Sequence, residues 1–144
     1  MNWIMKGTLA IGNHAEARDE ALLRQLEIRS VLSLDGSLEE SDARTLGLDR
    51  IESVPLIDGA GNSDMAFRRA IRAVGQLIDA HPAVLVQCHA GRSRSVVIVA
   101  GHLAAANGWP VDVAMAHVMA KRESAVSPEL ALHLQRVVDE GYQA

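Results

Sequence analysis

Apolar residues occur along the chain either in short runs or at intervals of three to four positions. Short runs bounded by turn residues predict strands, and the longer spacing predicts helices. In chain order we expect a hairpin, a helix, a strand, a short helix, a strand, the clearest helix, a strand and three further helices, over residues 3–11, 15–27, 30–34, 39–46, 50–56, 64–81, 83–86 and 95–106 and from about 110 and 128 onward. Strands that alternate with helices predict a three-layer α/β domain, with a central, mostly parallel sheet of four or five strands flanked by helices.

Residues at the ends of the predicted helices support these boundaries. Ser63 and Ser127 precede two of the helices and are expected N-caps, and Pro128 fits a first helical turn. Gly108 fits a left-handed C-terminal cap. The strand over 83–86 is expected at the centre of the sheet because it carries no charge and is β-branched, which is typical of strands covered on both faces.

Length and composition bound the kind of protein. The 144 residues suffice for one domain over 1–144 and not for two ordinary cores, and 49% hydrophobic with 22% charged residues is typical of a globule. A net charge of −4 without basic runs, together with only two Trp, one Tyr and one Phe, argues against nucleic acid as a partner. The oligomeric state is not readable from the sequence, and a monomer is expected.

Three features bear on the cellular location of the protein. The longest uncharged run, 95–111, contains His, Gly and Pro residues, so it predicts a buried helix and a turn, and no membrane contact is expected. The N-terminus lacks the pattern of a secretory signal or a transit peptide. The one cysteine, Cys88, cannot close an internal disulfide, and a free thiol is best tolerated in a reducing compartment, so we expect a cytoplasmic location.

The segment between the predicted central strand and the next helix carries the candidate chemistry. A loop that enters a helix N-terminus directs several backbone N–H groups at one point, where the helix dipole adds positive charge and an oxyanion is held. Gly91 lets this loop tighten, and Cys88 lies at its start, where the same groups stabilise a nucleophilic thiolate. Arg94 falls in the first turn of the helix, where its guanidinium can bind two oxygens of a phosphate above the sulfur.

This loop resembles the signature of a known family. At each fixed position it is similar to the Cys-x5-Arg loop of the cysteine-dependent protein phosphatases, and within them of the small dual-specificity branch, in Cys88, Ala90, Gly91, Ser93, Arg94 and Ser95. Residues 7–13 resemble the opening strand of that family, 28–34 its first buried strand, and 54–58 the stretch that bears its general acid. The resemblance implies a phosphatase-like fold and hydrolysis of phosphotyrosine, and also of phosphoserine or phosphothreonine, through a phosphocysteine and without a cofactor.

The resemblance also implies roles for single residues. Cys88 is the implied nucleophile, Arg94 the phosphate clamp, Asp58 the general acid and then base, and the Ser95 hydroxyl a hydrogen-bond donor to the sulfur. The residues implied in substrate binding are His89, Ala90, Gly91, Arg92, Ser93 and Arg94. The first and fourth of these occupy variable positions, and they are either solvated or bias the rim toward acidic substrates. The expected partner is a phosphorylated protein or another phosphomonoester.

Three aspartates compete for the general-acid role. Asp58 lies in an Asp-Gly loop at the carboxyl end of a predicted strand, where α/β sheets place ligands, although the same dipeptide is an ordinary turn signal. Asp64 is expected in the first turn of the following helix, and Asp35 at the end of the neighbouring strand, where it supports the loop. The six histidines show no metal-ligand spacing, so no metal is expected.

Alternative functions remain open. The family usually has histidine before the nucleophile, and the uncharged Gln87 in its place predicts weaker stabilisation of the thiolate. After Arg122, the Pro-Asn pair of the family is replaced by Pro128 and Glu129, which removes an expected supporting hydrogen bond. A phosphate-binding module that has lost turnover is therefore an alternative. A sulfurtransferase or arsenate reductase, which also holds a cysteine in an anion loop, is another.

Overall fold

A five-stranded sheet forms the centre of the computed structural model, which describes residues 1–141. Its strands lie in the order β1 (Asn2–Met5), β2 (Leu9–Gly12), β5 (Val84–Gln87), β3 (Ser30–Ser33) and β4 (Arg50–Ser53). The first two form an antiparallel edge hairpin, and all other neighbours are parallel. The mostly parallel sheet and its predicted central strand are confirmed. Residues 142–144 of the predicted domain lie outside the described residues.

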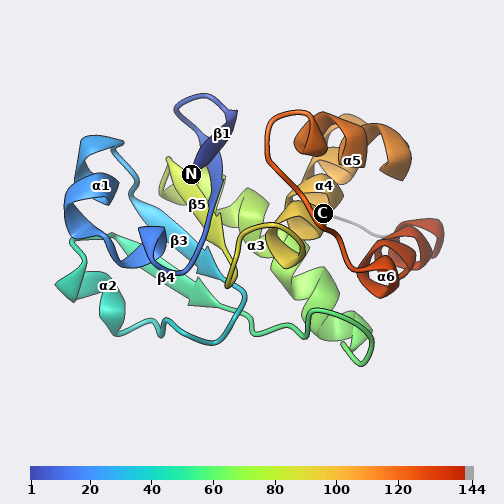
Figure 1. Cartoon of the computed structure of the whole chain (residues 1–144), viewed down its shortest axis with the longest axis horizontal. Helices are drawn as coiled ribbons and strands as arrows, with labels where there is room; N and C mark the ends of the chain where they lie inside the picture. Colours follow the sequence, from blue (N-terminus) through green and yellow to red (C-terminus); the bar gives the residue numbers. More distant parts are fainter. Residues whose placement is uncertain (142–144) are drawn as a thin grey trace.

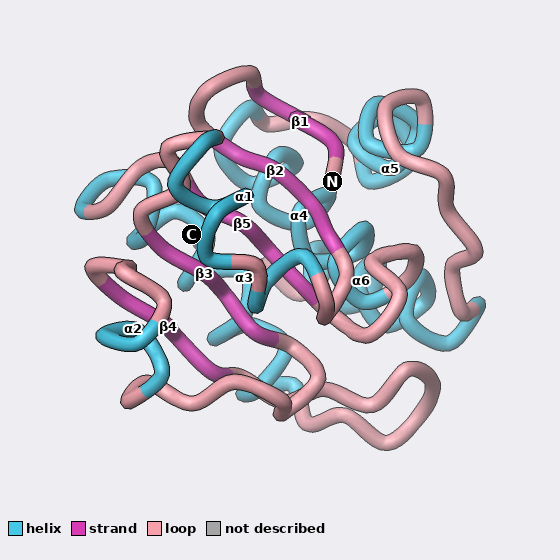
Figure 2. The backbone as a smooth tube through the Cα atoms, turned by 60° about the vertical axis from the view of Figure 1, so that its left-hand side comes forward, coloured by secondary structure: helices cyan, strands magenta, loops and turns pink. Residues whose placement is uncertain are grey.

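Helices cover both faces of this sheet (Figure 1). One face carries η1 (Glu16–Arg18), α1 (Glu20–Gln25) and α2 (Asp42–Thr45), and the other carries α3 (Asp64–Ala80), α4 (Arg94–Asn107), α5 (Val111–Met119) and α6 (Pro128–Asp139). Figure 2 shows α1 in front of the strands, with α3 and α4 behind them. The predicted three-layer α/β architecture is therefore confirmed.

The alternation of side chains along β5 explains why both faces need cover. Val84 and Val86 belong to the core under α3 to α6, and Leu85 belongs to a second core under η1 and α1. All three side chains are fully buried. Because successive residues of a strand point to opposite faces, a strand apolar at every position is stable only between two layers. This places the end of β5, and the loop after it, in the middle of the molecule.

Three predicted elements are shorter than their apolar patterns suggest. The helix expected over 15–27 is two pieces, because Asp19 between them has an extended backbone and its carboxylate caps α1 by accepting from the Leu22 N–H at 3.1 Å. The short helix expected over 39–46 is only the four residues of α2. The strand expected over 50–56 ends at Ser53, although two later N–H groups still bond to the neighbouring strand and its extension.

The predicted caps are confirmed at two of three places. Ser63 caps α3 by accepting from the Ala66 N–H at 3.1 Å, and Gly108 ends α4 with a φ of +67°. Ser127 precedes α6 but makes no cap hydrogen bond with its side chain, because its hydroxyl donates to the Glu129 carboxylate instead. Within residues 1–141, no helix is both long and apolar enough to cross a membrane.

Candidate active site

The loop 88–93 joins the central strand β5 to the buried helix α4. None of its backbone N–H groups donates a hydrogen bond to another group of the described chain. Arg94 begins α4, as predicted, so the unpaired N–H groups of the first helical turn adjoin those of the loop. Backbone donors left without partners beside a helix N-terminus form a site for an oxyanion.

Cys88 lies at the start of this loop with its side chain almost completely buried. The Ser95 hydroxyl, also buried, donates a hydrogen bond to the Cys88 Sγ at 2.9 Å. A hydroxyl that donates to the sulfur stabilises negative charge on that atom. The structure thus brings together the two residues that the sequence predicts as nucleophile and sulfur-bonding serine.

Arg94 is fixed by one hydrogen bond, and another N–H group of its guanidinium has no partner within the described chain. Its Nη1 donates to the Leu56 carbonyl at 3.1 Å, which fixes the side chain against the segment after β4. Its Nε is buried and has no hydrogen-bond partner within the described chain. A buried donor without a partner is costly, so the arrangement favours an anion that accepts from it. The orientation fits the predicted phosphate clamp.

Asp58 reaches the same place from a different part of the chain. Its Oδ1 accepts a hydrogen bond from the Ser93 hydroxyl at 2.6 Å. Asn62 braces the loop around it: the amide oxygen accepts from the Ile57 N–H at 2.7 Å, and the amide nitrogen donates to the Ile57 carbonyl at 2.9 Å and the Gly59 carbonyl at 3.3 Å. The carboxylate is therefore fixed although its loop is rich in glycine.

These groups line one pocket of about 260 Å³. Its walls are formed by eight residues from three segments of the chain, Asp58, Cys88, His89, Ala90, Arg92, Ser93, Arg94 and Ala125. A pocket of this size that combines a thiol, a guanidinium, a carboxylate and free N–H groups suits a small oxyanion ester. No cluster of His, Cys, Asp or Glu side chains within residues 1–141 is arranged to hold a metal ion.

The two other candidate acids lie elsewhere. Asp64, in the first turn of α3 as expected, is bound by both terminal nitrogens of Arg136 and by His133, which holds the pKa of this carboxyl far below its usual range. Burial opposes ionisation of Asp35, but hydrogen bonds from Ser37 and Gln87 and the positive charge of Arg94 outweigh it and lower the pKa. Neither lines the pocket, so Asp58 is the aspartate that the geometry favours.

Gln87, which departs from the family pattern, is completely buried. Its side-chain nitrogen donates to the Cys88 carbonyl at 3.1 Å, and its oxygen accepts from the Ser33 hydroxyl in a very short hydrogen bond. The amide is therefore satisfied on both sides, and it holds the backbone of the nucleophile. The second departure, Glu129, lies on the surface, and its carboxylate accepts from the Ser127 hydroxyl.

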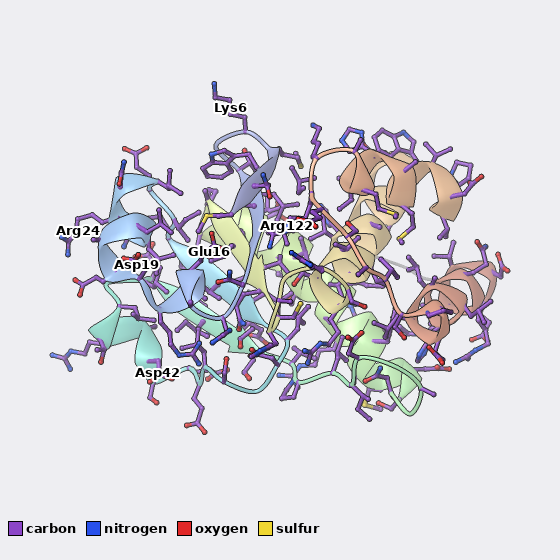
Figure 3. The ribbon with its side chains drawn as sticks, in the orientation of Figure 1. Lys6, Glu16, Asp19, Arg24, Asp42 and Arg122 are labelled. Atoms are coloured by element: carbon purple, nitrogen blue, oxygen red, sulfur yellow. The ribbon has the colours of Figure 1, made fainter. Side chains whose placement is uncertain are left out.

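Two residues that sequence reasoning did not assign to the site support the loop from outside. Arg122, labelled in Figure 3, donates from Nε to the Gly91 carbonyl at 2.8 Å and from Nη2 to the Ala90 carbonyl at 3.1 Å. The backbone N–H of His14 donates to the His89 carbonyl at 3.0 Å, and the imidazole rings of these two residues stack with centroids 4.4 Å apart. The motif around Arg122 was a weak signal, and no signal pointed to His14.

The variable residues of the loop lie at its rim. Arg92 and His89 are both exposed, and both line the pocket. Arg92 pairs with Glu123 at 3.4 Å. An exposed pair of this kind is screened by water and contributes little to stability. The Arg92 side chain thus remains available to an acidic group on a substrate.

Gly91 is expected to tolerate no side chain. Its φ is +68°, and an added Cβ would lie 2.5 Å from the Gly12 carbonyl oxygen and 2.7 Å from the Arg122 Nη2. Gly108 has nearly the same φ, +67°, but open space around it. Both alanine variants carry the strain of the left-handed backbone, and only Gly91→Ala adds a collision, so its free energy of unfolding should fall by at least about 1 kcal/mol more than that of Gly108→Ala.

Urea unfolding measures this difference in the free energy of unfolding. Titration with tungstate, an oxyanion, measures anion binding by the loop. Gly91→Ala should weaken tungstate binding, whereas Gly108→Ala should not. Equal destabilisation by the two variants, with tungstate binding intact in both, would contradict the close packing of the loop against β2 and Arg122.

The fold and the site together define a class of protein. A central parallel strand that leads through a Cys-x5-Arg loop into a buried helix, with an aspartate facing the loop, is the arrangement expected of a cysteine-dependent phosphatase. The family model described as "Dual specificity phosphatase, catalytic domain" matches residues 9–137, so the chain belongs to this family.

Individual relatives agree with this assignment. Dual specificity protein phosphatase 1 of Arabidopsis thaliana is 27% identical over 114 residues, which are 79% of this chain and 57% of that protein. Tyrosine-protein phosphatase yvh1 of Schizosaccharomyces pombe is 36% identical over 62 residues, 43% of this chain and 18% of that protein. The chain thus spans about half and about a fifth of these two relatives. The structure of human DUSP28 has the same fold, with a TM-score of 0.82 at 20% identity over 97% of this chain and 96% of that one.

Proposed function

We propose that this protein hydrolyses phosphomonoesters through a phosphocysteine at Cys88, with phosphorylated proteins as its substrates. Phosphotyrosine, and also phosphoserine or phosphothreonine, is the substrate group, in keeping with the family to which the chain belongs. The reaction needs no metal or other cofactor. Because it depends on a free thiol, we propose a reducing compartment such as the cytoplasm as its location.

In the first step, the Cys88 thiolate attacks phosphorus and forms an S–P bond as the P–O bond of the ester breaks. The N–H groups of the loop and the free guanidinium N–H groups of Arg94 hold the three other phosphate oxygens and stabilise the charge of the transition state. Asp58, in its protonated form, gives its proton to the departing alcohol or phenol oxygen.

In the second step, water attacks the phosphorus of the phosphocysteine while the Asp58 carboxylate takes a proton from it. The S–P bond breaks, inorganic phosphate leaves, and the thiolate returns. The Ser95 hydroxyl, 2.9 Å from the sulfur, stabilises the thiolate as it departs. Asp58 ends the cycle protonated and ready to act again as an acid.

The observation that carries this proposal is that Asp58, Cys88 and Arg94 line the same pocket. A module that only binds phosphate needs the loop and the arginine but no carboxylate beside them, since a negative charge there repels the ligand. A sulfurtransferase or arsenate reductase has no ester oxygen to protonate. A carboxylate held at the oxyanion site by Ser93, in a loop that Asn62 braces, is therefore best explained by ester hydrolysis.

The direct test is hydrolysis of phenyl phosphate and of a phosphotyrosine peptide by the purified protein in the presence of EDTA. Turnover that is unaffected by EDTA and inhibited competitively by tungstate is the expected result. A protein that binds tungstate but turns over neither substrate would be a phosphate-binding module. Turnover of thiosulfate or arsenate alone would support the sulfur or arsenic chemistry instead.

A further inference from the structure

We propose that the Ser93 hydroxyl is a positioning group for the general acid, and that the backbone N–H of Ser127 fixes its direction. The inference rests on the proposed function and adds a residue to it. The three groups form a chain of hydrogen bonds: the Ser127 N–H donates to the Ser93 Oγ at 3.0 Å, and the Ser93 hydroxyl donates to the Asp58 Oδ1 at 2.6 Å.

Ser93 does not do what a serine at its position usually does. It is the N-cap residue of α4, where a serine side chain ordinarily accepts a hydrogen bond from an N–H of the first helical turn. Here the side chain makes no such bond, although the residue is only 6% exposed. Its hydroxyl is turned instead toward two groups that are 34 and 35 residues away in the sequence.

The backbone N–H of Ser127 sets the direction of this chain of hydrogen bonds. An N–H group can only donate, so the Ser93 oxygen must accept from it, and the single hydroxyl hydrogen of Ser93 is left for Asp58. The hydrogen bond to a carboxylate is also the stronger of the two, because the acceptor is charged. The serine therefore donates to Asp58 in a fixed orientation.

This arrangement distinguishes the two oxygens of Asp58. A protonated carboxyl group has one oxygen that accepts and one that carries the proton. Because Oδ1 already accepts from Ser93, the acid proton belongs on Oδ2. The Ser93 hydroxyl thus leaves Oδ2 as the oxygen that donates to the leaving group. Without it, the proton is shared between the two oxygens and the carboxyl group is free to rotate.

The predicted signature is a loss that depends on the leaving group. Ser93→Ala removes the hydroxyl and keeps the backbone N–H of the loop. We expect kcat/KM for phenyl phosphate, whose oxygen needs protonation, to fall about ten- to a hundredfold. The loss for an activated aryl phosphate should be several times smaller, so the ratio of the two rate constants changes. Inhibition by tungstate should remain, since it depends on the loop and Arg94.

A second pair of variants isolates the donor to Ser93. Ser127 has a φ of −62°, which proline adopts without strain, so Ser127→Pro removes the N–H and leaves the backbone path. Ser127→Ala removes the hydroxyl and keeps the N–H. Ser127→Pro should change the ratio of kcat/KM for the two substrates in the same direction as Ser93→Ala does. Ser127→Ala should keep the ratio of the parent protein.

Asp58→Asn is measured alongside to separate the acid role of Asp58 from the positioning role of Ser93. If this variant shows the dependence on the leaving group and Ser93→Ala and Ser127→Pro do not, the hydrolytic proposal stands and the positioning role of Ser93 is wrong. If Asp58→Asn itself shows no dependence, the acid assignment and the inference built on it both fail. Equal losses for both substrates in Ser93→Ala, with tungstate inhibition also lost, would mean that the hydroxyl only supports the loop.

Discussion

Replacing Cys88 by serine is expected to lower kcat for any phosphomonoester by at least about ten-thousandfold. A serine hydroxyl at this position stays protonated at neutral pH and is a poor nucleophile without a general base to activate it. The Ser95 hydroxyl does not act as such a base, because it donates its hydrogen to the atom at this position. Steady-state hydrolysis of phenyl phosphate, measured against the parent protein, gives the size of the loss.

The same variant tests whether oxyanion binding is kept when turnover is lost. The N–H groups of the loop and the Arg94 guanidinium are unchanged in Cys88→Ser, so tungstate should still bind with an affinity close to that of the parent. Ser95→Ala is the matched control, because it removes a donor to the sulfur and keeps the nucleophile, and it should retain measurable turnover. Parent-like rates in Cys88→Ser would exclude a phosphocysteine.

Replacing Asp58 by asparagine should lower kcat/KM for phenyl phosphate by about a hundredfold to ten-thousandfold. Phenol and tyrosine have a pKa of about 10, so the departing oxygen needs a proton in the transition state. Asparagine keeps the size of the side chain and an oxygen that accepts from Ser93, and it lacks the acid proton. With an activated aryl phosphate, whose phenol is far more acidic, the loss in kcat/KM should be much smaller, because this constant reports only the first step.

Asp64→Asn and Asp35→Asn are the controls for this prediction. Asp64 is paired with Arg136 and His133, Asp35 accepts from the Ser37 N–H, and neither aspartate lines the pocket. Their loss should affect both substrates alike. A dependence on the leaving group in Asp64→Asn and none in Asp58→Asn would mean that the general acid lies at the start of α3 and not in the loop before it.

The layers of the fold and the centre of the site follow from local patterns in the sequence. The apolar run of β5, the helical spacing in α3 and the spacing of Cys88 and Arg94 are properties of contiguous segments, and each predicts its structure without knowledge of the rest of the chain. The boundaries of the helices and strands depend on more than the hydrophobic spacing. Asp19 interrupts a stretch with helical spacing, because its backbone is extended and its carboxylate caps the start of α1.

Contacts between distant segments account for what the sequence did not predict. Ser93 and Ser127 both precede helices, and neither side chain caps its helix. The Ser93 hydroxyl donates to Asp58, which the fold brings to it, whereas the Ser127 hydroxyl donates to Glu129 two residues along the chain. Asn62 resembles an ordinary loop residue, and its bracing role follows from how the chain turns around Asp58. Arg122 joins the loop from 31 residues away. The contacts of Ser93 with Asp58 and of Arg122 with the loop join segments far apart in the sequence, so they depend on how those segments pack together.

Detection of phosphoryl transfer to Cys88 tests the central claim most directly. Asp58→Asn is the suitable protein, because with an activated aryl phosphate its first step proceeds while the second lacks its base, so the phosphoenzyme accumulates. Acid quenching during turnover, proteolysis and mass spectrometry should find one phosphoryl group on the peptide that contains Cys88, and none when Cys88→Ser is added. Turnover without a phosphorylated Cys88 peptide, or with the phosphoryl group on another residue, would contradict the account.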